Sequence, residues 1–144
     1  FKFPMSLLLR FMGAMPVDRS KANNLTEAIA QEIHKHDELH VMVPPEGTRG
    51  KAAKWKTGFY FIAKMANVPI MLGYLDYKLK EASFGEPFYP TDDIHADFEY
   101  IKQYYQKFTP KNLEGYHVNL IVPDNYKERE AQVAAFKDVA GTSA

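Results

Sequence analysis

Apolar residues alternate along the chain between helical and extended spacing, and this alternation constrains the fold more than any other feature of the sequence. Val68–Tyr77 is a nearly continuous apolar run, which is typical of a strand buried on both faces. Amphipathic patterns on either side of it predict helices over residues 57–66 and 91–107. Because helices alternate with strands, we expect an α/β fold with a mostly parallel central sheet flanked by helices.

The same two spacings predict most of the remaining elements. Helical spacing predicts further helices at 4–12 and 24–33, and a charged, alanine-rich composition predicts one at 126–139. Extended spacing predicts short strands at 15–17, 39–43, 84–88 and 116–122. Asn24, Thr57 and Thr91 are expected to act as N-caps. The helix after Thr91 should bury one face, formed by Ile94, Phe98, Ile101 and Tyr105.

Composition excludes several classes of protein. The chain has 144 residues, of which 46% are hydrophobic, so it can fill the core of one domain and is not intrinsically disordered. It has no cysteine, which excludes a disulfide scaffold, a thiol nucleophile and Cys-ligated metals. Its 18 basic and 18 acidic residues balance, so no global charge attracts nucleic acid. The longest apolar run is far shorter than the roughly 20 residues that span a bilayer.

A local anion site is predicted where the 39–43 strand ends, in the segment Pro44–Lys51. Arg49 offers a planar fork of donors, Gly47 lets the backbone approach a ligand closely, and Thr48 adds a hydroxyl. Four positive charges and no acid lie between Arg49 and Lys56. The alternative from pattern alone is a solvated basic turn in which Glu46 pairs with Arg49.

Arg19 is the second candidate, because it follows the short extended segment 15–17. Arginines at the ends of two strands can converge on one phosphate. The alternative is an ordinary surface pair between Asp18 and Arg19.

Other catalytic and metal-binding motifs do not fit. The glycines of a phosphate-binding Walker loop and of a dinucleotide fingerprint are missing. His36 and His40 have the spacing of a zinc-protease pair, but Asp37 replaces the glutamate that this motif requires. We therefore expect His34, His36 and His40 at the surface, and Asp92 and Asp93 as helix-start residues.

Three ordered blocks together resemble the glycerolipid acyltransferase family, whose type member is 1-acyl-glycerol-3-phosphate acyltransferase. They are Gly13–Arg19, Pro44–Gly50 and Val68–Leu72. Trp55–Tyr60 and Asp76–Tyr77 are also similar to bacterial members, and the likeness extends over residues 1–120. Pro44, Gly50 and Leu72 replace the family's phenylalanine, serine and proline, which bears on substrate selectivity.

The resemblance implies transfer of a fatty acyl group from an acyl thioester to a lysophosphatidate-like hydroxyl in phospholipid synthesis. The donor would be acyl-CoA or acyl carrier protein, with no cofactor and no metal, at the cytoplasmic face of a membrane or in the cytoplasm. Arg19 and Arg49 would hold the glycerol phosphate, with Lys56 as a further contact. Glu46 and Gly47 would position the acceptor, and Thr48 would support the loop.

The family's first block, His-x-x-x-x-Asp, supplies the general base, and none of the five histidines here has aspartate five positions later. Because that block lies upstream in the family and the chain begins at Phe1, we expect the chain to be cut before it, with no catalytic residue of its own. The predicted organisation is an incomplete acyltransferase-like α/β domain at 1–122 and a helical tail at 123–144.

Two alternatives to an acyltransferase stay open at this point. The first is a non-catalytic truncated domain that binds anionic lipid or phosphate. The second is an α/β domain whose basic loop recruits a protein. Lys2, Arg10 and the apolar residues of Phe1–Met12, with the basic stretch around Trp55, could rest on anionic lipid. Those apolar residues could equally belong to the core.

Overall fold

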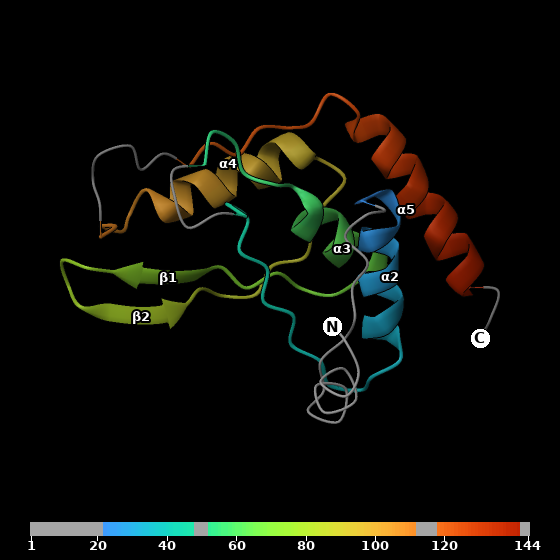
Figure 1. Ribbon diagram of the computed structural model, residues 1–144, viewed down its shortest axis with the longest axis horizontal. Helices are drawn as coiled ribbons and strands as arrows, with labels where there is room; N and C mark the ends of the chain where they lie inside the picture. The colour runs from blue at the N-terminus through green and yellow to red at the C-terminus, as the bar shows by residue number, and fades with distance from the viewer. Residues whose placement is uncertain (1–21, 48–51, 112–117, 142–144) are drawn as a thin grey trace, which may run out of the picture.

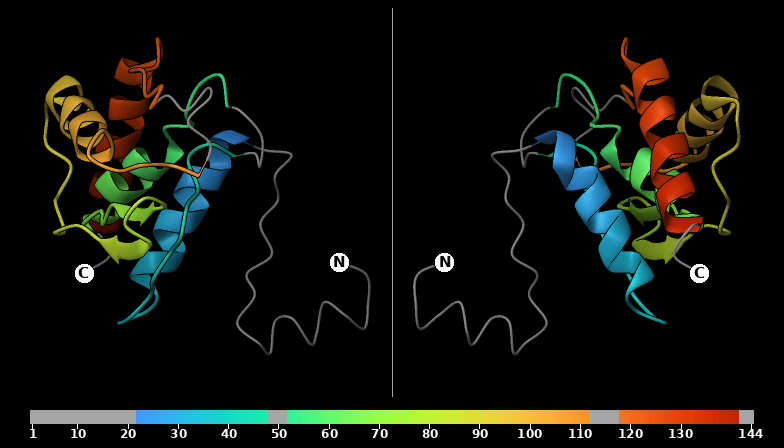
Figure 2. Two further views of the ribbon diagram at one scale, coloured as in Figure 1. Left: turned by 90° about the vertical axis from the view of Figure 1, so that its left-hand side faces the viewer. Right: turned by 90° about the vertical axis from the view of Figure 1, so that its right-hand side faces the viewer.

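A short helix, α3 (Gly58–Ala66), lies at the centre of the molecule, with α2 (Ala22–His34) and α4 (Ile94–Tyr105) on opposite sides of it (Figures 1 and 2). The computed structural model describes residues 22–47, 52–111 and 118–141. A last helix, α5 (Tyr126–Gly141), packs against α3, and strands β1 (Gly73–Asp76) and β2 (Glu81–Phe84) form a hairpin at the far end of the molecule. These bounds confirm the predicted helices at 24–33, 57–66, 91–107 and 126–139, within a few residues at their ends.

The central position of α3 follows from its sequence, which is apolar around nearly its whole circumference. Every residue from Tyr60 to Ala66 is buried. The ring of Tyr60 packs edge-on against Phe98 of α4, with centroids 5.2 Å apart. The largest fully buried side chains come from α3, α4 and the segment before α5, and they are Tyr60, Phe61, Phe98, Ile101 and Leu120.

The face predicted for the helix after Thr91 is confirmed for Ile94, Phe98 and Ile101, which are at most 3% exposed. Tyr105 is half-buried and meets the ring of Trp55 edge-on at 5.3 Å. It closes the edge of the core instead of lying within it.

The N-cap of α4 is Asp93, so the prediction of Thr91 is wrong. The Asp93 carboxylate accepts hydrogen bonds from the backbone N–H groups of His95 and Ala96, at 3.0 and 3.1 Å. Thr91 lies before the helix, where its N–H and hydroxyl both donate to the buried carboxylate of Asp97. Thr57 does precede α3, but its side chain makes no capping hydrogen bond.

The apolar run Val68–Tyr77 contains β1, which pairs with β2 in antiparallel register. Gly73 lies opposite Phe84 and Asp76 opposite Glu81, and a bridge between Ile70 and Phe88 continues the pairing. β2 begins three residues before the strand predicted at 84–88. The expectation of burial on both faces is wrong for β1, because Leu75 is 62% exposed. β2 pairs along the edge of β1, and α4 covers only one face of the hairpin.

The segment 39–43 forms no strand with the rest of the described chain, and it is not buried, since Met42 is 86% exposed. Residues 118–122 are likewise outside any assigned strand. Residues 4–12 and 15–17 lie outside the described ranges. The parallel sheet therefore stays a prediction. Among the described helices, none is long and apolar enough to cross a bilayer.

Candidate functional site

The loop that follows residues 39–43 turns sharply at Gly47. The Gly47 N–H donates to the carbonyl of Pro44 at 3.2 Å, and Gly47 has a φ of 64°, in the left-handed region that favours glycine. Glu46 precedes it in this turn and is partly exposed. The turn thus presents bare backbone beside a carboxylate.

Lys56 lies directly against this loop. Its N–H donates to the carbonyl of Pro45 at 2.7 Å. Its side chain crosses Gly47 so closely that a Cβ there would lie 2.9 Å from Lys56 Cε and 3.1 Å from Nζ. The structure therefore brings together three of the six predicted site residues, Glu46, Gly47 and Lys56. An ammonium beside exposed backbone suits an anionic ligand.

The other three predicted site residues, Arg19, Thr48 and Arg49, lie outside the described residues. Their convergence on one phosphate stays a prediction, and so does the pairing of Glu46 with Arg49.

Contacts from late in the sequence hold the segment that carries Lys56. Trp55 is 5% exposed, and its N–H donates to the carbonyl of Asn119 at 3.0 Å. The side-chain amide of Asn119 donates in return to the carbonyl of Ala53. Asn119 thus bonds to both Ala53 and Trp55, and the indole of Trp55 is buried, so the next residue, Lys56, is held beside the loop.

Arg129 of α5 is a residue that the sequence reasoning missed. Its guanidinium lies 4.0 Å from the centroid of the Phe61 ring and donates to the hydroxyls of Thr57, at 3.2 Å, and Thr26, at 3.3 Å. Burial lowers its pKa. Within the described ranges it forms no ion pair with a carboxylate. Arg129 therefore joins α5 to Thr26 of α2 and to Thr57 at the start of α3. Thr57 is the residue that follows Lys56.

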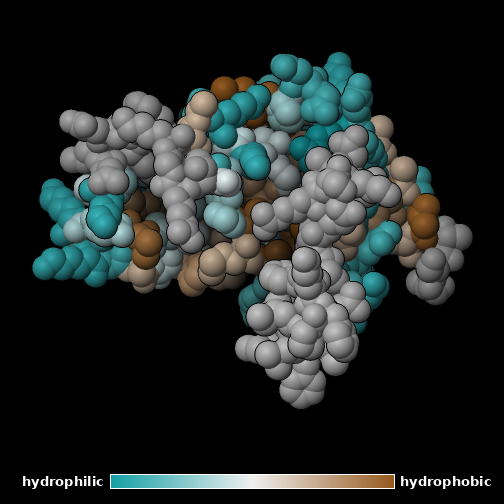
Figure 3. Space-filling view, in the orientation of Figure 1, coloured by the Kyte–Doolittle hydropathy of each residue, from teal (hydrophilic) through white to brown (hydrophobic). Residues whose placement is uncertain are grey.

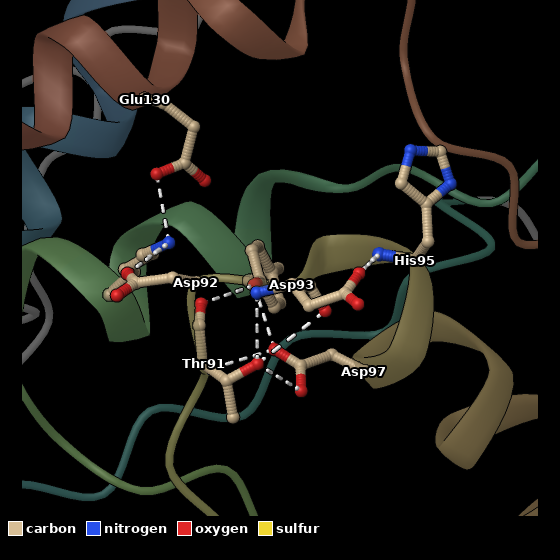
Figure 4. Close-up of polar contacts among 8 residues, drawn as sticks. Thr91, Asp92, Asp93, His95, Asp97 and Glu130 are labelled. Carbon is tan, nitrogen blue, oxygen red and sulfur yellow. Dashed lines mark hydrogen bonds and ion pairs between the residues drawn. The ribbon is translucent and has the colours of Figure 1, made fainter.

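A second polar cluster lies between α3, α4 and α5 (Figure 4). The Tyr60 hydroxyl donates to Asp97 at 2.8 Å, and burial together with the Asp97 charge raises the pKa of Tyr60, which keeps the phenol protonated. Lys64, only 7% exposed, pairs with Glu130 at 2.8 Å and with Asp92 at 3.5 Å. Tyr60, Lys64 and Asp97 are buried between the helices, whereas Asp92 is exposed. The buried contacts hold α5 and α4 on α3.

The histidines behave as predicted. His34 stacks on Phe136, His36 contacts Glu32 at 3.3 Å, and these two and His40 are exposed. The described part of the chain contains no group of three or more side chains able to hold a metal ion.

Residues 1–71 match the model of a family described as Acyltransferase. The match supports an acyltransferase family. It includes α2, α3, the 44–47 loop and Lys56, and it ends before β1. No curated protein and no solved structure matches the chain. The family match supports a general acyltransferase function, and the described site residues Glu46, Gly47 and Lys56 lie inside the matched region.

Proposed function

We propose that the chain serves acyl transfer from an acyl thioester, either acyl-CoA or acyl carrier protein, to the hydroxyl of a lysophosphatidate-like glycerolipid in phospholipid synthesis. The observation that carries the proposal is the placement of Lys56 over Gly47, in the loop that also bears Glu46. The Lys56 ammonium is a charged donor suited to a phosphate, and Gly47 has no side chain to block its approach. The family match gives the reaction class.

In this proposal Lys56, Arg19 and Arg49 bind the glycerol phosphate, and Glu46, Gly47 and Thr48 shape the acceptor loop. The acceptor oxygen forms a bond to the thioester carbonyl carbon, the carbon–sulfur bond breaks and the thiol leaves. A general base must take the hydroxyl proton. Because no histidine here is followed by aspartate five residues later, we assign this chain the acceptor half of the site and no catalytic residue.

The fold and the location belong to the same proposal. We propose that the described elements form part of an α/β domain with a mostly parallel sheet, at 1–122, followed by the helical segment 123–144. A lipid acceptor requires access to a membrane, so we propose a peripheral position at its cytoplasmic face.

The absent His-x-x-x-x-Asp block favours a second candidate, a non-catalytic domain that binds anionic lipid or phosphate through the same loop. An acyltransferase assay separates the two. Turnover by the 144-residue chain excludes the non-catalytic candidate, whereas acceptor binding without turnover supports it.

The test of the site is calorimetric titration with lysophosphatidate. Lys56→Ala and Arg49→Ala should each weaken binding about 10-fold or more, because each removes a charge-assisted hydrogen bond. Lys54→Ala is the matched control, since this exposed lysine lies two residues from Lys56 and should leave affinity unchanged. Equal affinity for all three variants and the unaltered chain would refute the assigned roles.

A further inference from the structure

The β1–β2 hairpin has one covered face. Tyr74 stacks on Phe108, which follows α4, with ring centroids 3.7 Å apart. Two neighbouring tyrosines of α4 donate hydroxyl hydrogen bonds to backbone carbonyls near β1, Tyr104 to Leu72 and Tyr105 to Gly73, each at 3.0 Å. The hairpin is therefore fixed to α4 by ring stacking and by side-chain-to-backbone bonds.

The opposite face is apolar and exposed. Gly73, Leu75 and Tyr77 share it because side chains alternate along a strand, and Phe84 lies across Gly73 in the register. Leu75 is 62% exposed, Phe84 61% and Tyr77 50%. Leu79, in the connecting loop, is 62% exposed. A shallow depression of about 300 Å³ runs beside Leu75, Tyr77 and Ala82, and no other described element covers it.

Positive charge lies at the tip of the hairpin, beside this face. Lys78 and Lys80 are exposed in the loop. Thr109 holds the loop, because the Tyr77 N–H donates to its carbonyl at 2.8 Å. The nearby acids are Glu81, which is exposed, and Asp76, which is 4% exposed. Figure 3 shows hydrophilic side chains at the hairpin tip and hydrophobic ones along the strands.

The loop is also rigidly held. One carboxylate oxygen of Asp76 accepts from the N–H groups of Lys78 and Leu79, both at 2.9 Å, and the other accepts from Thr109 at 3.2 Å. Because three backbone donors fix this turn, Tyr77 and Leu79 are presented outward without further ordering, which lowers the entropic cost of docking.

We propose that this face of the hairpin, formed by Leu75, Tyr77, Leu79 and Phe84 with Lys78 and Lys80 at its rim, docks onto the surface of an anionic bilayer. The leucine side chains would insert at the boundary between headgroups and acyl chains, and Tyr77 would lie at the depth of the headgroups. Lys78 and Lys80 would contact the anionic headgroups. The basic rim argues for anionic lipid over a neutral apolar partner. This surface lies after the family-matched residues. The proposal rests on the peripheral membrane position proposed above, names the surface that would make the contact, and does not depend on acyl transfer.

The test is co-sedimentation with phosphatidylcholine vesicles, with and without phosphatidylglycerol, in the absence of any acyl donor or lysophospholipid. The unaltered chain should bind the phosphatidylglycerol vesicles, and added salt should weaken binding. Lys78→Gln with Lys80→Gln should weaken binding roughly 30-fold, since each lysine near an anionic surface contributes about fivefold. Leu79→Asp should weaken it at least 10-fold.

The matched control is Lys127→Gln with Lys137→Gln. Both lysines are exposed on α5, at the other end of the molecule from the hairpin, and this pair should bind vesicles as the unaltered chain does (Figure 1). Circular dichroism checks that each variant is folded.

Three results would overturn the proposal. They are no binding by the unaltered chain, equal loss in the α5 control, and vesicle binding unchanged by the hairpin variants. If the unaltered chain fails to bind vesicles but forms a concentration-dependent dimer that Leu79→Asp dissociates, the face contacts a second copy and not a membrane. Because no substrate is present, failure here leaves the lysophosphatidate titration untouched, and the reverse also holds.

Discussion

Gly47 combines a left-handed backbone with close contact to the side chain of Lys56. A φ of 64° disfavours any residue with a Cβ, and the added atom would lie 2.9 Å from Lys56 Cε. The lysine end can move aside, so the backbone conformation supplies most of the cost in stability. Displacing the ammonium nevertheless alters the site.

We therefore expect Gly47→Ala to lower the free energy of unfolding by about 1–2 kcal/mol and to weaken lysophosphatidate binding. Urea denaturation and calorimetric titration measure the two effects. Gly58→Ala is the control, because a Cβ on this first residue of α3 meets nothing within 4 Å. That variant should be stabilised by about 0.5–1 kcal/mol. If Gly47→Ala left the free energy of unfolding unchanged, the backbone strain inferred for a non-glycine residue at this position would be contradicted.

Among the elements, the hairpin depends on one carboxylate. Hydrogen bonds from the N–H groups of Leu79, Thr109 and Lys78 hold the pKa of Asp76 below its usual value. Because the folded pKa lies below the unfolded one, this stabilisation is complete above the unfolded pKa of about 4. It is lost as the pH falls through the lower folded pKa.

Asp76→Asn should therefore lower the melting temperature at pH 7, and the gap to the unaltered chain should narrow as the pH falls below about 4. Thermal melts between neutral and acidic pH test this. A gap that stays constant across the range would show that Asp76 acts through packing and not through its charge. Glu81→Gln, which removes an exposed charge from the opposite strand, should show no such narrowing.

The helices and strands also show which elements the apolar pattern of the sequence can predict and which it cannot. Among the described helices, α2, α3 and α4 were predictable because their apolar spacing is regular, whereas α5 was predictable only from its charged, alanine-rich composition. The hairpin was not, because a continuous apolar run such as Val68–Tyr77 is equally compatible with a strand between parallel neighbours and with a hairpin strand that has one bare face. The cap of α4 was misplaced because Thr91, Asp92 and Asp93 all have capping side chains, and only Asp93 reaches the helix amides.

The site was predictable where its residues are close in sequence. Glu46, Gly47 and Lys56 lie within eleven consecutive residues, so the sequence alone indicates that they are close in space. Arg129 was not predictable, because it reaches Thr57 across 72 residues and nothing in the charged pattern of α5 marks it. The contact between Arg129 and Thr57 is visible only once α5 is packed on α3.

Across the whole molecule, Arg129 links helices that are distant in sequence. Arg129→Met keeps an apolar stem over Phe61 but leaves the buried hydroxyls of Thr26 and Thr57 without this donor. We expect a loss of about 1–3 kcal/mol in the free energy of unfolding. Urea denaturation measures it, with Lys127→Met, an exposed substitution on the same helix, expected within about 0.5 kcal/mol of the unaltered chain. Equal stability of the two variants would show that Arg129 is not a structural link.

Contacts between the two halves of the chain have a consequence for the order of folding. Trp55 is hydrogen-bonded to Asn119, Tyr60 to Asp97, and Phe61 packs against Arg129, so the family-matched segment completes its core with residues that are synthesised after it. During translation, α3 therefore stays an exposed apolar helix until α4 and α5 have left the ribosome. We expect the loop that carries Gly47 and Lys56 to be assembled only after α5 has been synthesised, and the nascent segment before it to bind chaperones.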